Sequence, residues 1–293
     1  MTTIATHNST YHADDVFAVA TILLIEPEAR VIRTRDKDLI SPADYVVDVG
    51  MEYEPEKNRF DHHQLGGAGK RENGIQYASA GLVWRKFGEI LAGGKREAEI
   101  IDRIFMEPLD AHDNGMPIAE YRYEGIRDYS IVDFFYSYLS KPNDSEENLY
   151  KIFMNVVGVA KELLVREINR AKETVLSEVA VEEIYEATKD KRVIILEKEH
   201  NWYSTLMQKP EPVYVIYPRN DGVSWGVKCV PATSKVFGTR RKDLPIAWGG
   251  KTDEELQKIT GVPDALFAHR GLFMASAKTR EGAIALAELA LNA

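Results

Sequence analysis

Tyr45-Val46-Val47-Asp48-Val49-Gly50 predicts a strand that is buried on both faces and ends at a carboxylate. Upstream of it, Thr3 to Thr6 predicts a shorter strand that runs directly into His7, and Ala29 to Arg33 predicts another. Open α/β sheets bind their ligands where the strands end. We therefore expect His7 and Asp48 to be brought together by one sheet.

Predicted helices alternate with these strands. The apolar residues after Asp14 have helical spacing as far as Pro27, and Asp14 and Asp15 fall in the first turn, where carboxylates are favoured. Two more helices are predicted, at Ala80 to Leu91 with Ser79 as N-cap and Gly93-Gly94 at its end, and at Glu97 to Leu109 before Asp110, His112 and Asp113. The alternation predicts an α/β fold with a mostly parallel sheet.

The second half of the chain has a different pattern. Glu147 to Thr188 predicts one long amphipathic helix, with Gly158 as the place for a break. The segments after it predict strands at Val193–Leu196, Val213–Tyr217, Trp225–Val230 and Leu266–Ala268, with helices at Asp253–Gly261 and Arg280–Leu291. Asn220-Asp221-Gly222 predicts a hairpin turn between the second and third of these strands.

Three parts follow from these patterns. We expect a metal-binding catalytic domain at residues 1–145, a helical connector at 146–190, and a smaller α+β substrate-binding domain at 191–293. The long helix fits equally well as the seam of a homodimer.

Charge is distributed unevenly along the chain. The 293 residues carry 37 Lys and Arg against 46 Asp and Glu, a net of −9, which argues against general nucleic-acid binding. Residues 191–293 hold 15 basic and 11 acidic side chains, a net of +4, which leaves residues 1–190 with −13. An acidic half that holds divalent cations and a basic half that holds phosphates would suit a phosphate enzyme. Uneven surface charge is the alternative.

The compartment is predicted from what the sequence lacks. No apolar run approaches the ~18 residues of a membrane span, and the N-terminus has no basic and apolar segments typical of a secretory leader. Cys229 is the only cysteine, so an intramolecular disulfide is excluded. We expect a cytoplasmic protein without a membrane partner.

Phe60-Asp61-His62-His63-Gln64 is the densest group of metal-ligand side chains. Together with His7, His12, Asp14, Asp48 and Asp110, it supplies the imidazoles and carboxylates that bind Mn²⁺, Fe²⁺, Co²⁺ or Zn²⁺. Two such ions about 3.5–4 Å apart can activate a water and stabilise the charge of a phosphoryl group. The pattern predicts a two-metal phosphoesterase. Each residue taken singly has a simpler explanation: His7 could be an ordinary partly buried histidine, and Asp48 could form a turn before Gly50.

The C-terminal segment predicts a substrate-binding site. His269 and Arg270 follow a predicted strand, and Lys278, Thr279 and Arg280 lead into the last helix. Amides at a helix start hold phosphates, and Arg280 can contact them with two donors. The alternative is a charged helix start on the surface. Trp202, Trp225 and Trp248 fit base stacking or, more simply, a core.

Motifs along nearly the whole chain resemble one family. They are Thr6–Asp15 (THNSTYHADD), Val46–Gly50, Tyr53, Asp61–Gln64, Ser79–Leu82, Asp110–Gly115 (DAHDNG) and Lys278–Ala283 (KTREGA). They are similar to those of the melanocyte-proliferating-gene family in the DHH phosphoesterase superfamily, which also includes manganese-dependent pyrophosphatases and single-strand exonucleases. The missing leader suggests a prokaryotic relative.

The resemblance implies roles for individual residues. His7, His12, Asp14, Asp48, Asp61, His62 and Asp110 would be ligands of two divalent ions, Mn²⁺ by preference. Asp48 would bridge the two ions. Asp113 is the alternative to Asp110 as the ligand from the fourth motif. Asp61, His62 and His63 would be catalytic, with His63 facing the substrate. His12 stands where many superfamily members have an aspartate, which makes one site richer in nitrogen and leaves the identity of the metal open.

The function implied is that of a 3′-to-5′ exonuclease on short single-stranded RNA, with Mn²⁺ as cofactor. A pyrophosphatase or small-nucleotide phosphoesterase of the same fold is the alternative. A non-catalytic, metal-stabilised module that binds RNA or protein is the third possibility.

Overall fold

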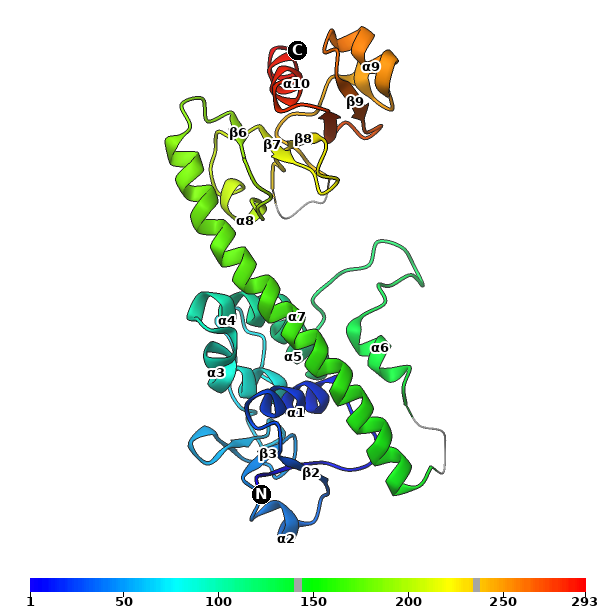
Figure 1. The fold of residues 1–293 in the computed structure, drawn as a ribbon. Coiled ribbons are helices and arrows are strands. Elements are labelled where there is room, and N and C mark those ends of the chain that lie inside the picture. The colour runs from blue at the N-terminus through cyan, green and yellow to red at the C-terminus, as the bar shows by residue number, and fades with distance from the viewer. Residues whose placement is uncertain (140–143, 234–237) are drawn as a thin grey trace. The chain divides into compact units, whose positions relative to one another are not determined.

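The computed structural model describes residues 1–139, 144–233 and 238–293. The chain divides into two compact units, Met1–Lys172 and Glu173–Ala293, each containing a five-stranded sheet (Figure 1). The expected mixed α/β class is confirmed. The division falls inside α7 (Glu146–Ala187), so the proposed boundaries at 145 and 190 remain predictions.

The first unit is rich in helices. Its strands are β1 (Thr3–Thr6), β2 (Arg30–Arg33), β3 (Tyr45–Val47), β4 (Tyr53–Glu54) and β5 (Arg59–Phe60). Its helices before α7 are α1 (Ala13–Ile25), α2 (Lys37–Ile40), α3 (Ser79–Ala92), α4 (Lys95–Ile101), α5 (Glu107–Asp113) and α6 (Ile131–Tyr136). A 3-10 turn, η1 (Pro55–Lys57), joins β4 to β5, and a π-helical turn, η2 (Asp102–Met106), joins α4 to α5.

Parallel pairing in the first sheet determines where the polar residues gather. The strand order is β2-β1-β3-β5-β4, in which β1 pairs with β2 and β3 in parallel, β3 pairs with β5 in parallel, and β4 pairs with β5 antiparallel. The carboxyl ends of β1, β3 and β5 therefore meet at one edge. His7, Asp48 and Asp61 are the residues that directly follow these three strands.

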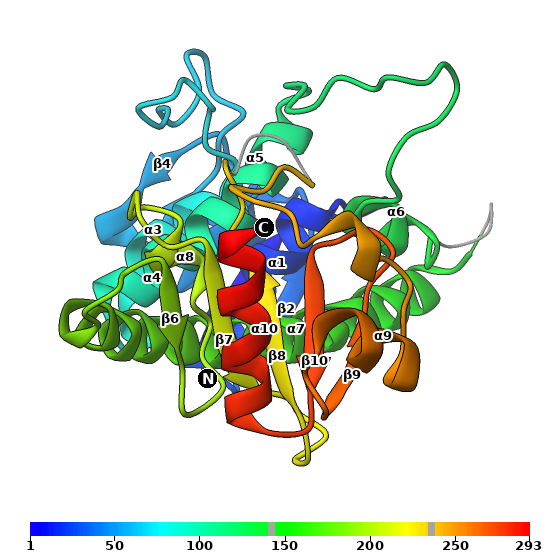
Figure 2. The same ribbon diagram turned by 90° about the horizontal axis from the view of Figure 1, so that it is seen from above.

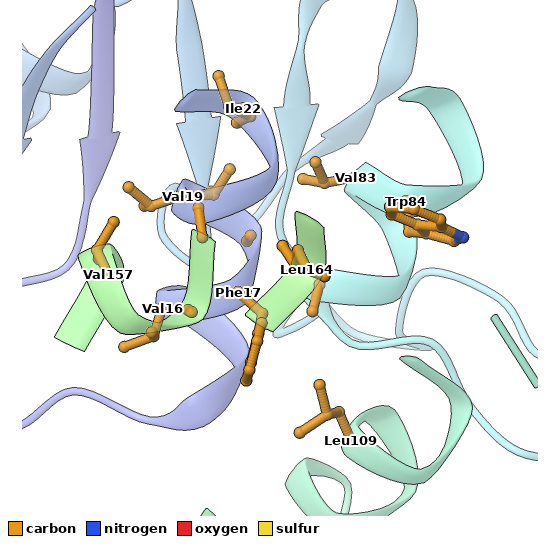
Figure 3. Packing of buried hydrophobic residues seen from close by; sticks show 14 of the residues in the cluster. Val16, Phe17, Val19, Ile22, Val83, Trp84, Leu109, Val157 and Leu164 are labelled. Carbon is orange, nitrogen blue, oxygen red and sulfur yellow. The ribbon is translucent and has the colours of Figure 1, made fainter. Parts of the chain in front are cut away.

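Both faces of this sheet are covered. Alternate residues of β1 and β3 point to opposite faces, so Ile4 and Val47 enter the main core while Ala5 and Val46 pack with Ile40 of α2. After Asp14 and Asp15 in its first turn, helix α1 is apolar except for Thr21 and almost fully buried, as expected for a helix inside a core. Figure 3 shows its Val16, Phe17 and Val19 beside Val157 and Leu164 of α7.

Three local expectations need correction. Ser79 is the first residue of α3 rather than its cap, because Ala78 occupies the N-cap position. Helix α7 runs from Glu146 to Ala187 as one element, without a break at Gly158. Asp110 and Asp113 lie within α5 and do not follow a helix.

The second unit follows α7 with β6 (Val193–Ile195), α8 (Tyr203–Leu206), β7 (Tyr214–Pro218), β8 (Trp225–Cys229), η3 (Ile246–Trp248), α9 (Asp253–Thr260), β9 (Ala265–Ala268), β10 (Met274–Ala277) and α10 (Arg280–Asn292). Strands β7 and β8 form the predicted antiparallel hairpin, and β10, which the sequence pattern did not predict, pairs with β8 and β9.

The second sheet, in the order β6-β7-β8-β10-β9, is also buried on both faces. Helix α10 packs on one face, where Figure 2 shows it lying along β7, β8 and β10. On the other face, Val181 and Tyr185 of α7 form a core with Trp202 and Leu206. Across the described part of the chain, no helix has the length and apolar character needed to cross a bilayer.

Candidate metal centre

His7 stands at the end of β1 with its ring buried. Its Nδ1 atom lies 2.9 Å from the carbonyl oxygen of Asn8. A carbonyl only accepts, so in the neutral ring Nδ1 carries the proton and Nε2 keeps its lone pair. Nε2 lies 3.1 Å from Oδ2 of Asp15 and 3.2 Å from Oδ2 of Asp48. The ring therefore presents a metal-binding atom to two carboxylates.

Asp14 is held at the start of another helix. It lies in the first turn of α1, and its carboxylate accepts hydrogen bonds from the backbone amides of Ser79 (2.9 Å) and Ala80 (2.7 Å) at the start of α3. Free amides at a helix start favour an anion. These bonds fix a fully buried carboxylate in one orientation, as a ligand requires.

Asp48 has an unusual backbone conformation. Strand β3 ends at Val47, and Asp48 then adopts a φ of 55° in the left-handed region, which aspartate tolerates better than most residues. The turn places its Oδ1 atom 3.4 Å from Nε2 of His62 and within 3.2 Å of Oγ of Ser79, which donates to it. Strained backbone of this kind is concentrated at functional sites.

His62 completes the group from a second direction. Its Nε2 atom lies 3.4 Å from Asp48 and 3.2 Å from Oδ2 of Asp113 on α5. Three sets of ligand atoms lie close enough together to hold an ion: His7, His12 and Asp48; Asp14, His62 and Asp113; and Asp48, His62 and His63. Asp48 and His62 each belong to two sets, so the sets are contiguous.

The chemistry of these residues fits a divalent cation. Among the described residues, Nε2 of His7, Nε2 of His62 and Oδ2 of Asp15 are buried and make no well-directed hydrogen bond, although charged atoms lie 3.1 to 3.4 Å away. Buried polar atoms are rarely left in this state, and a bound ion is one of the few explanations. Imidazole and carboxylate ligands suit Mn²⁺, Fe²⁺, Co²⁺ and Zn²⁺.

The electrostatics of the group favour positive charge. Burial is the largest influence on both histidines and lowers their pKa values. The surrounding carboxylates overcome it and raise the pKa of His7 to about 10 and that of His62 to about 11. Burial, followed by the charges of Asp113 and Asp48, raises the pKa of Asp14. The negative charge that holds protons here would equally favour metal ions, which displace those protons on binding.

Asp61 supports a histidine and lies outside these three sets. Its Oδ1 atom accepts from the backbone amide of His63 (3.1 Å) and lies 2.8 Å from Nδ1 of the same ring. Its Oδ2 atom accepts from the amide of Met51 at 2.6 Å. The contact between Nδ1 of His63 and Oδ1 of Asp61 is the main influence on the pKa of His63, which it raises. A carboxylate only accepts, so it holds the proton on Nδ1 and leaves Nε2 of a half-exposed ring available.

Asp110 is occupied by other partners. Its Oδ2 atom pairs with Nη1 of Arg71 at 2.6 Å, and its Oδ1 atom accepts from the amide of Gly81 at 3.0 Å. Arg71 also binds Asp102 through Nε and Nη2. The aspartate of α5 that lies near His62 is thus Asp113, the alternative fourth-motif ligand. Asp110 instead joins α5 to α3 and to the loop that contains Arg71.

A cavity of about 880 Å³ opens beside the centre. Its lining includes His7, His12, Asp48, Asp61 and His63. Its volume lies toward the upper end of the ~300–1,000 Å³ usual for ligand sites. Four of the expected ligands, His7, His12, Asp48 and Asp61, therefore border a space large enough for a ligand.

Apart from His63, the predicted substrate-binding residues lie in the second unit. Nδ1 of His269 accepts from the amide of Gly271 (2.9 Å), and Arg270 and Lys278 are exposed. Thr279 caps α10, and its amide and hydroxyl both donate to Asp264. Arg280 donates to Glu197 through Nε (2.9 Å) and Nη2 (2.7 Å). Their role toward a substrate remains a prediction.

Two residues, one in the centre and one beside it, were not expected as functional residues. Asp15 was identified only as a first-turn carboxylate, yet it contacts His7 and accepts from the amide of His12. The Thr6–Asp15 motif could have indicated it. Arg71 lies in a turn-rich loop, and the sequence around it gives no signal of its role.

Comparison with known proteins gives a consistent family. The sequence profile of MYG1 exonuclease, described as "Uncharacterised protein family (UPF0160)", matches residues 3–291. MYG1 exonuclease of Bos taurus is 32% identical over 98% of this chain and 84% of its own length. MYG1 exonuclease of Rattus norvegicus is 30% identical over 98% and 84%. The MYG1 protein of Chlamydia muridarum is 27% identical over 95% and 92%. The sequence motifs, confirmed by these matches, therefore assign the chain to the MYG1 exonuclease family.

Proposed function

We propose that this protein is a divalent-metal-dependent phosphodiesterase that removes nucleotides from the 3′ end of short single-stranded RNA. The observation that carries the proposal is the position of Asp48, whose carboxylate belongs to two adjoining sets of ligand atoms. A shared carboxylate is what a pair of closely spaced metal ions requires. Relatives of the chain bear the name MYG1 exonuclease, which supports the choice of a nucleic-acid substrate.

The residues divide into two sites around that carboxylate. His7, His12 and Asp48 would hold one ion, and Asp14, His62 and Asp113 would hold the other. Asp48, whose Oδ1 atom lies 3.4 Å from Nε2 of His62, would be the carboxylate shared between them. Asp113 takes the place first considered for Asp110. When bound, two such ions would supply a nucleophilic water and stabilise the charge on the phosphoryl group.

His63, oriented by Asp61, would transfer a proton during the reaction. Asp61 holds Nδ1 of His63 and so fixes the tautomer and the ring. The Nε2 atom is left to give a proton to the leaving oxygen or to take one from the attacking water. Asp61 acts through His63 and is a positioning residue rather than a ligand.

The test uses a short RNA that carries a label at its 5′ end, with Mn²⁺ present. A ladder that shortens from the 3′ end supports the proposal. RNA blocked by a 3′-phosphate, the matched DNA, and Asp48→Asn are the comparisons. No shortening by the wild-type protein, or equal shortening by Asp48→Asn, contradicts it.

The same preparation separates the alternatives. Release of phosphate from pyrophosphate, without cleavage of RNA, identifies a small-molecule phosphoesterase. Tight retention of metal without turnover of either substrate identifies a binding module.

A further inference from the structure

Beyond the ligand residues, the cavity beside the metal centre is lined by basic side chains. Arg35 follows β2, Lys37 begins α2, Lys57 ends η1, and Arg59 lies on β5. All four belong to the first unit, which as a whole is acidic. The lining of the cavity therefore combines the carboxylates and imidazoles of the metal centre with ammonium and guanidinium groups.

These basic side chains differ in whether they already have partners within the protein. Arg59 is held in place by donating to the carbonyl oxygens of Lys57 (3.0 Å) and Ser41 (3.2 Å). Lys57 pairs with Glu54 at 2.6 Å. Within the described parts of the chain, the side chains of Arg35 and Lys37 have neither a hydrogen bond nor an ion pair, and both residues are exposed. Two cations are thus free for a ligand.

The remaining lining suits a nucleotide. Ile40, Val46 and Val49 add apolar residues to the lining, and Met51 is 60% exposed although its backbone amide donates to Asp61. Glu52 is the one carboxylate in the lining outside the centre. A space of about 880 Å³ exceeds what a single phosphate group would fill and admits a nucleotide next to the reacting one.

We propose that Arg35, Lys37 and Arg59 form a subsite for the phosphate adjacent to the reacting one in an oligonucleotide. This inference rests on the proposed phosphodiesterase function and adds that the first unit itself binds the strand. Arginine and lysine bind phosphate oxygens through charge-assisted hydrogen bonds. The subsite predicts a preference for oligonucleotides over substrates that have one phosphate.

The test compares two substrates. Arg35→Ala and Lys37→Ala should each lower kcat/KM on single-stranded RNA about 10-fold and reduce the slope of log Kd against log salt by about 1. Hydrolysis of bis(p-nitrophenyl) phosphate, which has one phosphate, should stay unchanged. Arg166→Ala and Lys95→Ala remove matched charges from exposed positions of the first unit outside the cavity and should have no effect.

Glu52→Gln provides a test of opposite sign. Removal of this carboxylate should tighten RNA binding several-fold, because it opposes phosphate in the same cavity. Unchanged RNA cleavage and unchanged salt dependence in Arg35→Ala and Lys37→Ala would overturn the subsite.

Failure of the proposed function gives a different result. If the wild-type protein hydrolyses neither substrate, anisotropy of fluorescein-labelled RNA with Ca²⁺ in place of Mn²⁺ decides the matter. Binding that is lost in Arg35→Ala and Lys37→Ala supports the subsite without the activity. Absent binding, or equal binding by the variants, overturns it.

Discussion

The Oδ2 atom of Asp113 lies 3.2 Å from Nε2 of His62. Asp110, one helical turn earlier, is instead paired with Arg71. Residues three apart share a helix face, so one turn of α5 carries a ligand candidate and a structural carboxylate side by side. The two aspartates can therefore be separated by experiment.

Asp113→Asn should reduce bound Mn²⁺ from two ions per chain to one, because it removes a ligand next to His62. Asp110→Asn should keep both ions but lower the free energy of unfolding by about 1–3 kcal/mol, because a buried charged hydrogen bond is lost. Metal analysis after desalting and urea unfolding measure the two effects. The reverse pattern would restore Asp110 as the ligand.

Gly81→Ala should destabilise the first unit by about 1–3 kcal/mol. A Cβ atom at this position would lie 1.9 Å from Oδ2 of Asp110, so α3 and α5 would have to move apart. Gly158→Ala is the matched control, because its added Cβ meets nothing within 4 Å and alanine favours the helix by about 1 kcal/mol. Equal midpoints of urea unfolding for the two variants would contradict the close approach.

Asp61→Asn should leave the metal content unchanged and lower kcat at least ~100-fold, the usual contribution of a positioned acid or base. The amide no longer holds the proton on Nδ1 of His63. His63→Gln should cost about as much, and the double variant little more, because the pair acts as a unit. Additive losses would show that the two residues act separately, and loss of metal in Asp61→Asn would make Asp61 a ligand.

Cys229 should react slowly with thiol reagents in the folded protein. Burial raises the pKa of its thiol from 9.0 to about 12, so the thiolate fraction at pH 8 is lower by about 3 powers of ten. A folded-state pKa above the unfolded value stabilises the protein below pH 9 and loses that contribution between pH 9 and about 12. Ellman's reagent, with and without urea, measures the first effect. Fast reaction of the native protein would contradict the burial.

The strand-end positions of His7 and Asp48 were predictable because their signal is local. An apolar β-favouring run followed by a polar residue predicts both the strand and the edge, and this held for His7 and Asp48. Asp61 follows β5, which has only two residues and no periodicity of its own. It was found through the neighbouring imidazoles, and its hydrogen bonds to His63 and Met51 became visible only in the structure.

Other features depend on contacts between residues far apart in the sequence. Arg71 binds Asp102 and Asp110, which are 31 and 39 positions away, and Arg280 binds Glu197 at a separation of 83. The π-helical turn Asp102–Met106 precedes α5 and alters the helical register ahead of Asp110 and Asp113. No spacing rule reveals such a turn, so the different partners of the two aspartates became visible only in the structure.

Helix α7 has a consequence for how the chain unfolds. Phe153 to Ala171 contribute to the core of the first unit, and Val181 and Tyr185 contribute to a core of the second. Helices form and melt cooperatively along their backbone. Loss of either core would remove the packing that supports one end of this 42-residue helix. Fraying of that end would weaken the helix where it packs in the other core. Heat denaturation should therefore give a single calorimetric peak, and limited proteolysis should find no protease-sensitive linker between Glu146 and Ala187.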